Sequence, residues 1–117
     1  MPIKSNNPFE DGRALYERMV KELIVDIPIG GGMYRPQLNL SGLVKLVLEQ
    51  PKAAQVATQM LAEANEDKAV AQLHGTWLMM ALIAAFGEED TSVQLTRKMA
   101  PDFYESAVLQ LREQFGS

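Results

Sequence analysis

His74 is the only histidine in the 117-residue chain, and the chain has no cysteine. Chemistry that needs a thiol, a disulfide or two imidazoles is therefore excluded. A catalytic histidine also needs an orienting carboxylate and a nucleophile or polarised substrate. The nearest acidic residues along the chain are Asp67, seven residues before His74, and Glu88, fourteen after it. We assign no catalytic residue, no metal ligand and no cofactor, and we expect His74 to be partly buried and bonded to a backbone carbonyl.

Three consecutive glycines, Gly30–Gly32, follow an apolar run, and in such a context backbone amides can bind phosphate. A Walker loop ends in Lys-Ser/Thr, and a dinucleotide fingerprint has spaced glycines within a βαβ unit; this segment has neither. A connector is therefore favoured over a nucleotide site. The glycines precede Met33, Tyr34 and Arg35, which are residue types enriched at protein interfaces. We expect these three residues to bind a partner.

The acidic residues are unevenly placed. The net charge is −4, from 15 acidic and 11 basic residues, and the isoelectric point is about 4.9, which disfavours nucleic acid as a partner. Residues 51–90 hold the whole excess, with two lysines against Glu63, Glu66, Asp67, Glu88, Glu89 and Asp90. Most of these six fit as N-terminal caps of the helices that follow them, and together they predict an acidic patch that favours a basic partner protein.

The elements that must position these residues are helices. Apolar spacing and capping signals predict helices over 11–25, from Asn39 or Ser41 to 50, over 51–64, 67–86 and about 92–99, and from Pro101 to a stop at Gly116. The second half of 67–86 is apolar on every side, which is typical of a helix that others surround. We therefore predict an all-α fold, a compact bundle of five or six helices around a central apolar helix at about 67–86. A Gly/Pro-rich loop at about 26–38 has room for a short β-hairpin.

The chain length fits one domain. Residues 1–10 are polar with two prolines and are predicted to form a flexible arm, and residues 11–117 a single helical domain. The first residues lack the apolar stretch of a signal peptide. The longest apolar run, 77–86, would span about 15 Å as a helix, half of a bilayer core. With no cysteine, these features favour a cytoplasmic protein without membrane contact.

The leading hypothesis is a non-enzymatic protein that acts by binding another protein, as an adaptor, an inhibitor or a chaperone-like subunit. Self-association is one form of it, because the helix at 40–48 is apolar around much of its circumference. The alternative is a small-molecule binder or small enzyme with a pocket between the helix at 67–86 and the Gly30–Gly32 loop. In that alternative His74 would be the acid or base and Arg35 would bind an anion.

Overall fold

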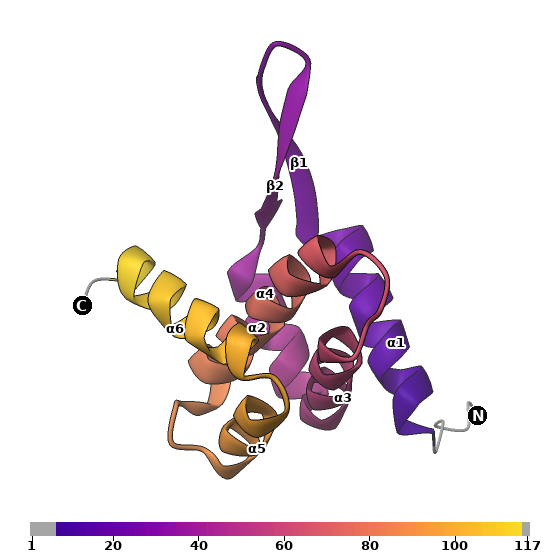
Figure 1. The fold of residues 1–117 in the computed structure, drawn as a ribbon, viewed down its shortest axis with the longest axis vertical. Coiled ribbons are helices and arrows are strands. Elements are labelled where there is room, and N and C mark those ends of the chain that lie inside the picture. Colours follow the sequence, from indigo (N-terminus) through magenta and orange to yellow (C-terminus); the bar gives the residue numbers. More distant parts are fainter. Residues whose placement is uncertain (1–6, 116–117) are drawn as a thin grey trace.

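A computed structural model describes residues 7–115, and it is mostly helical, as predicted (Figure 1). Its α-helices are α1 (Pro8–Arg18), α2 (Leu40–Glu49), α3 (Pro51–Ala62), α4 (Lys68–Phe86), α5 (Thr91–Met99) and α6 (Pro101–Phe115). A short π-helix, η1 (Met19–Leu23), follows α1. Strands β1 (Ile24–Gly30) and β2 (Met33–Leu38) form a two-stranded antiparallel sheet. The fold is a helical body that carries one β-hairpin.

The N-terminal helix begins and ends earlier than predicted. Its first residue is Pro8 rather than residue 11, and Asn7 caps it by accepting a hydrogen bond from the Phe9 amide at 3.0 Å. Proline suits this position because its fixed φ is already helical. The N-terminal segment predicted as flexible, residues 1–10, is therefore helical from Pro8 onward, and residues 1–6 lie outside the described residues. At its other end, the helix predicted to extend to residue 25 is replaced by η1 and then by β1. The β-branched residues Ile24 and Val25 favour a strand there.

The β-hairpin is longer than the short one predicted at 26–38. Its strands pair from Ile24 opposite Leu38 up to Gly30 opposite Met33. Gly31 and Gly32 connect them with φ values of +62° and +75°, and positive φ at both central residues is what a tight type I′ turn requires. Two prolines lie within the strands. They are tolerated because each strand of a two-stranded sheet has one free edge, where a missing N–H removes no ladder hydrogen bond.

The remaining helix boundaries follow local signals in the sequence. Asn39 caps α2 by accepting from the Gly42 amide at 3.0 Å, and α2 ends just before Pro51. Pro51 and Pro101 open α3 and α6 as predicted, although α3 ends two residues early, at Ala62. The predicted stop of α6 at Gly116 lies outside the described residues.

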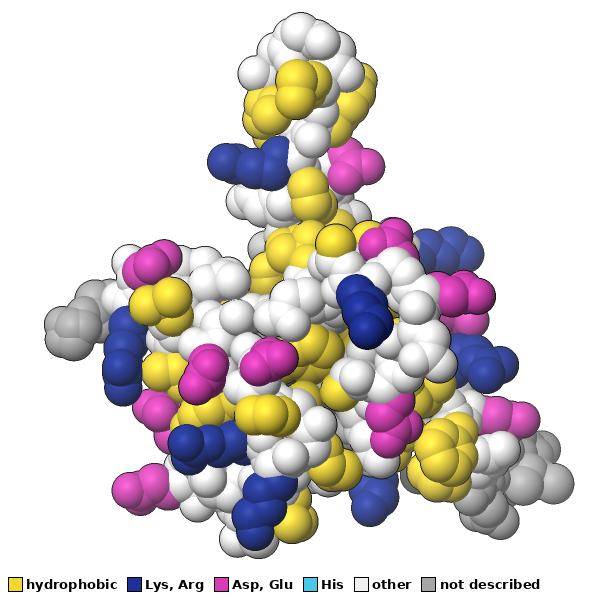
Figure 2. Space-filling view, in the orientation of Figure 1, with side chains coloured by type: hydrophobic (Ala, Val, Ile, Leu, Met, Phe, Trp, Pro, Cys, Tyr) yellow, Lys and Arg dark blue, Asp and Glu magenta, His cyan; other side chains and the backbone are white. Residues whose placement is uncertain are grey.

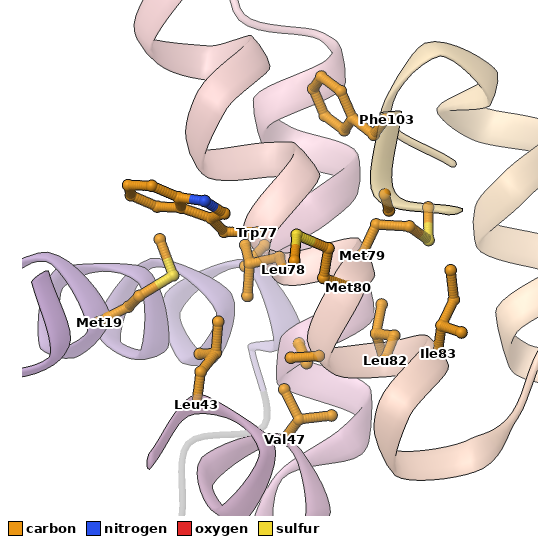
Figure 3. Packing of buried hydrophobic residues seen from close by; sticks show 14 of the residues in the cluster. Met19, Leu43, Val47, Trp77, Leu78, Met79, Met80, Leu82, Ile83 and Phe103 are labelled. Carbon is orange, nitrogen blue, oxygen red and sulfur yellow. The ribbon is translucent and has the colours of Figure 1, made fainter. Parts of the chain in front are cut away.

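Helix α4 supplies much of the hydrophobic core. Its residues 75–83 are all buried, and α2, α3, α5 and α6 all pack against it. Figure 3 shows its side chains leaving the helix in opposite directions, with Trp77 toward Met19 and Ile83 toward the other side. An apolar circumference of this kind needs neighbours on several sides.

One close contact in this core depends on a glycine. Gly75 lies against the buried ring of Phe103 in α6, and a Cβ atom at Gly75 would overlap that ring.

The apolar run at 77–86, which is too short to cross a bilayer, is only the second half of α4. Among the described helices, α4 as a whole has the length and hydropathy of one, with 56% of its most apolar window buried in the body.

Candidate functional site

The β-hairpin projects from the helical body as an arm, which we define as residues 24–38 (Figure 1). Figure 2 shows hydrophobic side chains on its outer part. Val25 and Ile29 in β1 are more than half exposed, and Met33 and Tyr34 in β2 are 63% and 64% exposed. Large apolar side chains gathered on a projecting element are typical of an interaction surface rather than of scattered surface residues.

The three predicted partner-binding residues lie at the outer end of β2, but they do not share one face. Successive residues of a strand point to opposite faces. Tyr34 pairs with Pro28 and lies on one face, whereas Arg35 pairs with Ile27 and lies on the other with Met33. A partner that contacts all three must therefore cover both faces of the arm.

The root of the arm is fixed to the body. The Asn39 amide donates a hydrogen bond to the Leu23 carbonyl at 2.8 Å, which joins the two chain segments where the arm begins and ends. Ile24 and Leu38, the first cross-strand pair, are half-buried and pack against the hydrophobic core. The inner end of the arm is therefore held, and the outer end extends into solvent.

The six acidic residues form two groups rather than one patch. Glu63, Glu66 and Asp67 precede α4, whereas Glu88, Glu89 and Asp90 follow it. The 19 residues of α4 separate the groups by about 28 Å. In Figure 1 the N-terminal end of α4 lies toward the hairpin, and its C-terminal end lies toward α5 on the far side of the body.

Capping accounts for two of these acidic residues. Asp67 caps α4 by accepting from the Val70 amide at 3.2 Å. Asp90 caps α5 by accepting from the Ser92 and Val93 amides at 2.9 and 3.3 Å. The Ser92 hydroxyl also donates to Asp90, and this bond, with the two amide bonds, lowers the pKa of the carboxyl group.

His74 is half-buried, and a tyrosine satisfies it where a backbone carbonyl was expected. The Tyr16 hydroxyl in α1 lies 2.7 Å from Nδ1 of His74, and the imidazole stacks on the Trp77 indole with ring centroids 5.7 Å apart. Burial lowers the pKa of His74, while the negative charge of Asp67 acts against this shift. Burial and Asp67 together raise the pKa of Tyr16. A neutral imidazole that accepts from a tyrosine suits a structural role.

Sequence reasoning missed Tyr16 as the partner of His74. The two residues are 58 positions apart, and they meet only because α1 and α4 come together in the folded body. The carboxylate that influences both is Asp67, two helical turns before His74 at the start of the same helix. Periodicity could have placed Asp67 near the His74 face, since seven residues are close to two turns. It could not have found Tyr16.

The pocket expected between α4 and the glycine loop lies elsewhere along the arm. A cavity of about 330 Å³ opens beside the inner half of β2 instead of at the turn. Its lining consists of Arg35, Pro36, Gln37, Leu38, Leu40, Trp77, Met80 and Gln114. Arg35, the anion-binding residue of the alternative hypothesis, is part of this lining. His74 stacks on Trp77 but is not part of this lining.

Helix α2, the predicted self-association surface, is largely covered within the body. Its apolar residues divide into buried Leu43, Leu46 and Val47, half-buried Leu40 and Val44, and Leu48, which is 52% exposed. The covering elements are η1, α3 and α4. The apolar circumference that suggested a second interface is thus mostly used by the fold itself.

Comparisons with known proteins add no functional information, because no family model, curated protein or solved structure matches the chain. Within residues 7–115, no group of three or more His, Asp or Glu side chains is placed to hold a metal ion. The function must therefore be argued from the geometry of the arm and the body.

Proposed function

We propose that this protein acts without catalysis, by binding another protein through the arm. The observation that carries the proposal is the exposure of the large apolar side chains on the arm, Met33 and Tyr34 above all. Proteins usually bury such side chains or use them as anchors in an interface. An adaptor, an inhibitor or a chaperone-like subunit would each use a projecting element of this kind.

The backbone of the arm supports the same function. A two-stranded hairpin alone is marginally stable in water, and both outer edges of this one carry unpaired backbone groups. Pro28 and Pro36 interrupt those edges, so a partner strand would have few donors to bind. Side-chain contacts from both faces therefore supply most of the binding free energy, as when a partner groove encloses the arm.

Charge favours a basic partner. The arm contains Asp26 and Arg35 and is neutral, so the net charge of −4 belongs to the rest of the chain. Of the two acidic groups, the one at 63–67 lies toward the arm (Figure 1). Such a group would raise the association rate of a basic partner while the arm provides the anchors. Added salt should then slow association, and a rate that is insensitive to salt would remove the electrostatic part of the proposal.

The test is a double substitution, Tyr34→Ala with Arg35→Ala, which removes one side chain from each face of the arm. The tagged wild-type protein, drawn gently from an extract of its own host, should carry a stoichiometric protein partner in native mass spectrometry. The double variant should bind that purified partner more weakly by over about 1 kcal/mol in calorimetry. Its circular dichroism should be unchanged, because both side chains are exposed.

The matched control is Leu95→Ala with Lys98→Ala on α5, at the far side of the body from the arm (Figure 1). It also removes one exposed apolar side chain and one exposed cation. The control should bind like the wild type. If the arm variant keeps full affinity, or if the control loses as much, the arm is not the binding element.

A further inference from the structure

We propose that the cavity beside the root of the arm is a binding site for a small amphipathic carboxylate. This site shares Arg35 with the proposed protein interface, but it does not depend on that function. The cavity lies between β2, the start of α2, the middle of α4 and the end of α6. Its volume of about 330 Å³ is within the usual range for small-molecule sites.

The polar part of the lining indicates an anion. Arg35 is its only charged side chain, and it makes no ion pair within residues 7–115. Asp26, the other charged residue of the arm, pairs with Pro36 and lies on the opposite face of the hairpin. A guanidinium without a carboxylate partner fits a ligand carboxylate bidentately. The side-chain amides of Gln37 and Gln114 can donate further hydrogen bonds.

The apolar part of the lining indicates a ligand with a hydrocarbon body. Leu38, Leu40, Trp77 and Met80 contribute to the cavity wall. Trp77 is 8% exposed and stacks on His74, so its position is fixed by the body rather than by the ligand. A lining that combines these apolar side chains with one cation selects molecules that carry an apolar chain and a single negative group. Inorganic phosphate would match only the cation.

Trp77 also makes the site measurable, because it is the only tryptophan in the chain. The probe is octanoate, which does not absorb where tryptophan is excited, and 1-octanol is its neutral counterpart. We expect octanoate to change the fluorescence of the full-length protein saturably, below about 20 mM. Octanol should bind at least about ten-fold more weakly, because it lacks the charge that Arg35 pairs with.

Two variants locate the ligand. Arg35→Gln should weaken octanoate binding at least about ten-fold and leave octanol binding unchanged. Arg13→Gln is the matched control, because Arg13 lines a different cavity of about 330 Å³ between α1 and α3. It should bind octanoate like the wild type. Both side chains are exposed, so both variants should fold.

NMR provides a second readout. The side-chain amide signals of Gln37 and Gln114 should shift with octanoate even if the fluorescence stays constant. The proposal is overturned if both methods show no saturable binding, or if octanol binds as well as octanoate. It is also overturned if Arg35→Gln has no effect or if Arg13→Gln abolishes binding. The assay contains no protein partner, so its failure leaves the proposed function of the arm untouched.

Discussion

The hydrogen bond between Tyr16 and His74 connects the N-terminal helix with the core helix. The pair is half-buried, and the imidazole lies between the tyrosine and Trp77, with ring centroids 5.6 and 5.7 Å away. A hydrogen bond of this kind stabilises a fold by about 1 kcal/mol, and more is lost when its partner remains buried and unsatisfied. We therefore regard His74 as a structural residue whose protonation state matters for stability.

The stability of the protein should decrease on acidification through His74. Burial lowers the pKa of His74 in the folded state below its ordinary value near 6.5, although Asp67 opposes the shift. The unfolded chain therefore binds more protons between the two pKa values, and stability rises with pH in that window. The contribution of His74 to stability is complete above the pKa that His74 has in the unfolded chain. It is lost as the pH falls through the lower pKa that His74 has in the folded protein. Urea unfolding should show the wild type losing stability relative to His74→Gln between about pH 7.5 and 5.

The wild type and His74→Gln have the same carboxylates. The effect of carboxylate titration on the free energy of unfolding therefore cancels when the two proteins are compared. Equal pH dependence of the free energy of unfolding in the wild type and in His74→Gln would contradict the role assigned to burial. Tyr16→Phe provides a further control. It removes the hydrogen bond but keeps the ring that buries the imidazole.

At the scale of single residues, local signals could be predicted and long-range ones could not. The capping roles of Asp67 and Asp90 follow from their position just before a helix. The exposure of Met33, Tyr34 and Arg35 could be predicted, because these residues directly follow a glycine-rich turn. Their division between two faces was not predictable, because it depends on strand register, which is a pairing of residues on both sides of the turn.

Among the elements, α4 shows most clearly how the helices hold together. Helices α2, α3, α5 and α6 pack against it, and the Phe103 ring of α6 comes close at Gly75. Gly75 costs helix propensity, about 1 kcal/mol relative to alanine. The close approach of the Phe103 ring compensates for that cost, which explains why a glycine stands in the middle of the longest helix.

Gly75→Ala should therefore destabilise the protein despite its better helix propensity. Overpacking a core typically costs about 1–3 kcal/mol, and the clash here is with a buried aromatic ring of α6 rather than a flexible chain end. We expect a net loss of about 1–2 kcal/mol in the free energy of unfolding, measured in urea. Gly75→Ala in a Phe103→Leu background should cost less, because the smaller side chain can move away. Additive effects of the two substitutions would refute the contact.

At the scale of elements, helix boundaries were more predictable than strand boundaries. Pro51, Pro101 and Gly87 lie next to apolar helical patterns, where proline and glycine are local start or stop signals. The change from helix to strand at Ile24 has no such marker. A helical periodicity runs up to this point, and only the pairing with Leu38 across the turn makes the strand the better choice.

The whole molecule combines a helical body, whose core is shared by all six α-helices, with an arm that adds little to that core. Beyond the first cross-strand pair, the arm residues are mostly exposed. Their structure must therefore be maintained mainly by the pairing within the hairpin itself. Because of this separation, changes in the outer part of the arm should have little effect on the stability of the body.

Shortening the arm tests this separation. Replacing residues 28–34 with Asn-Gly would leave Ile27 and Arg35 paired beside a turn of the same type. We expect the free energy of unfolding to change by less than about 1 kcal/mol, because most of the removed side chains are exposed. Urea unfolding followed by circular dichroism measures it. A large loss, or a transition that is no longer cooperative, would show that the arm is part of the folding unit.

The π-helix η1 has a consequence for geometry. Each residue of a regular helix turns the chain by about 100° around the helix axis. The number of residues between α1 and Ile24 therefore sets the direction, around that axis, in which the arm leaves the body. A π-helical turn holds one residue more than an α-helical turn. Deletion of a single residue from Met19–Leu23 would restore a regular α-helix and rotate the arm about the helix axis, so that it projects in a different direction. The direction of the arm is thus set by the number of residues in η1, and a variant with one residue fewer there would present the same arm side chains in a different direction.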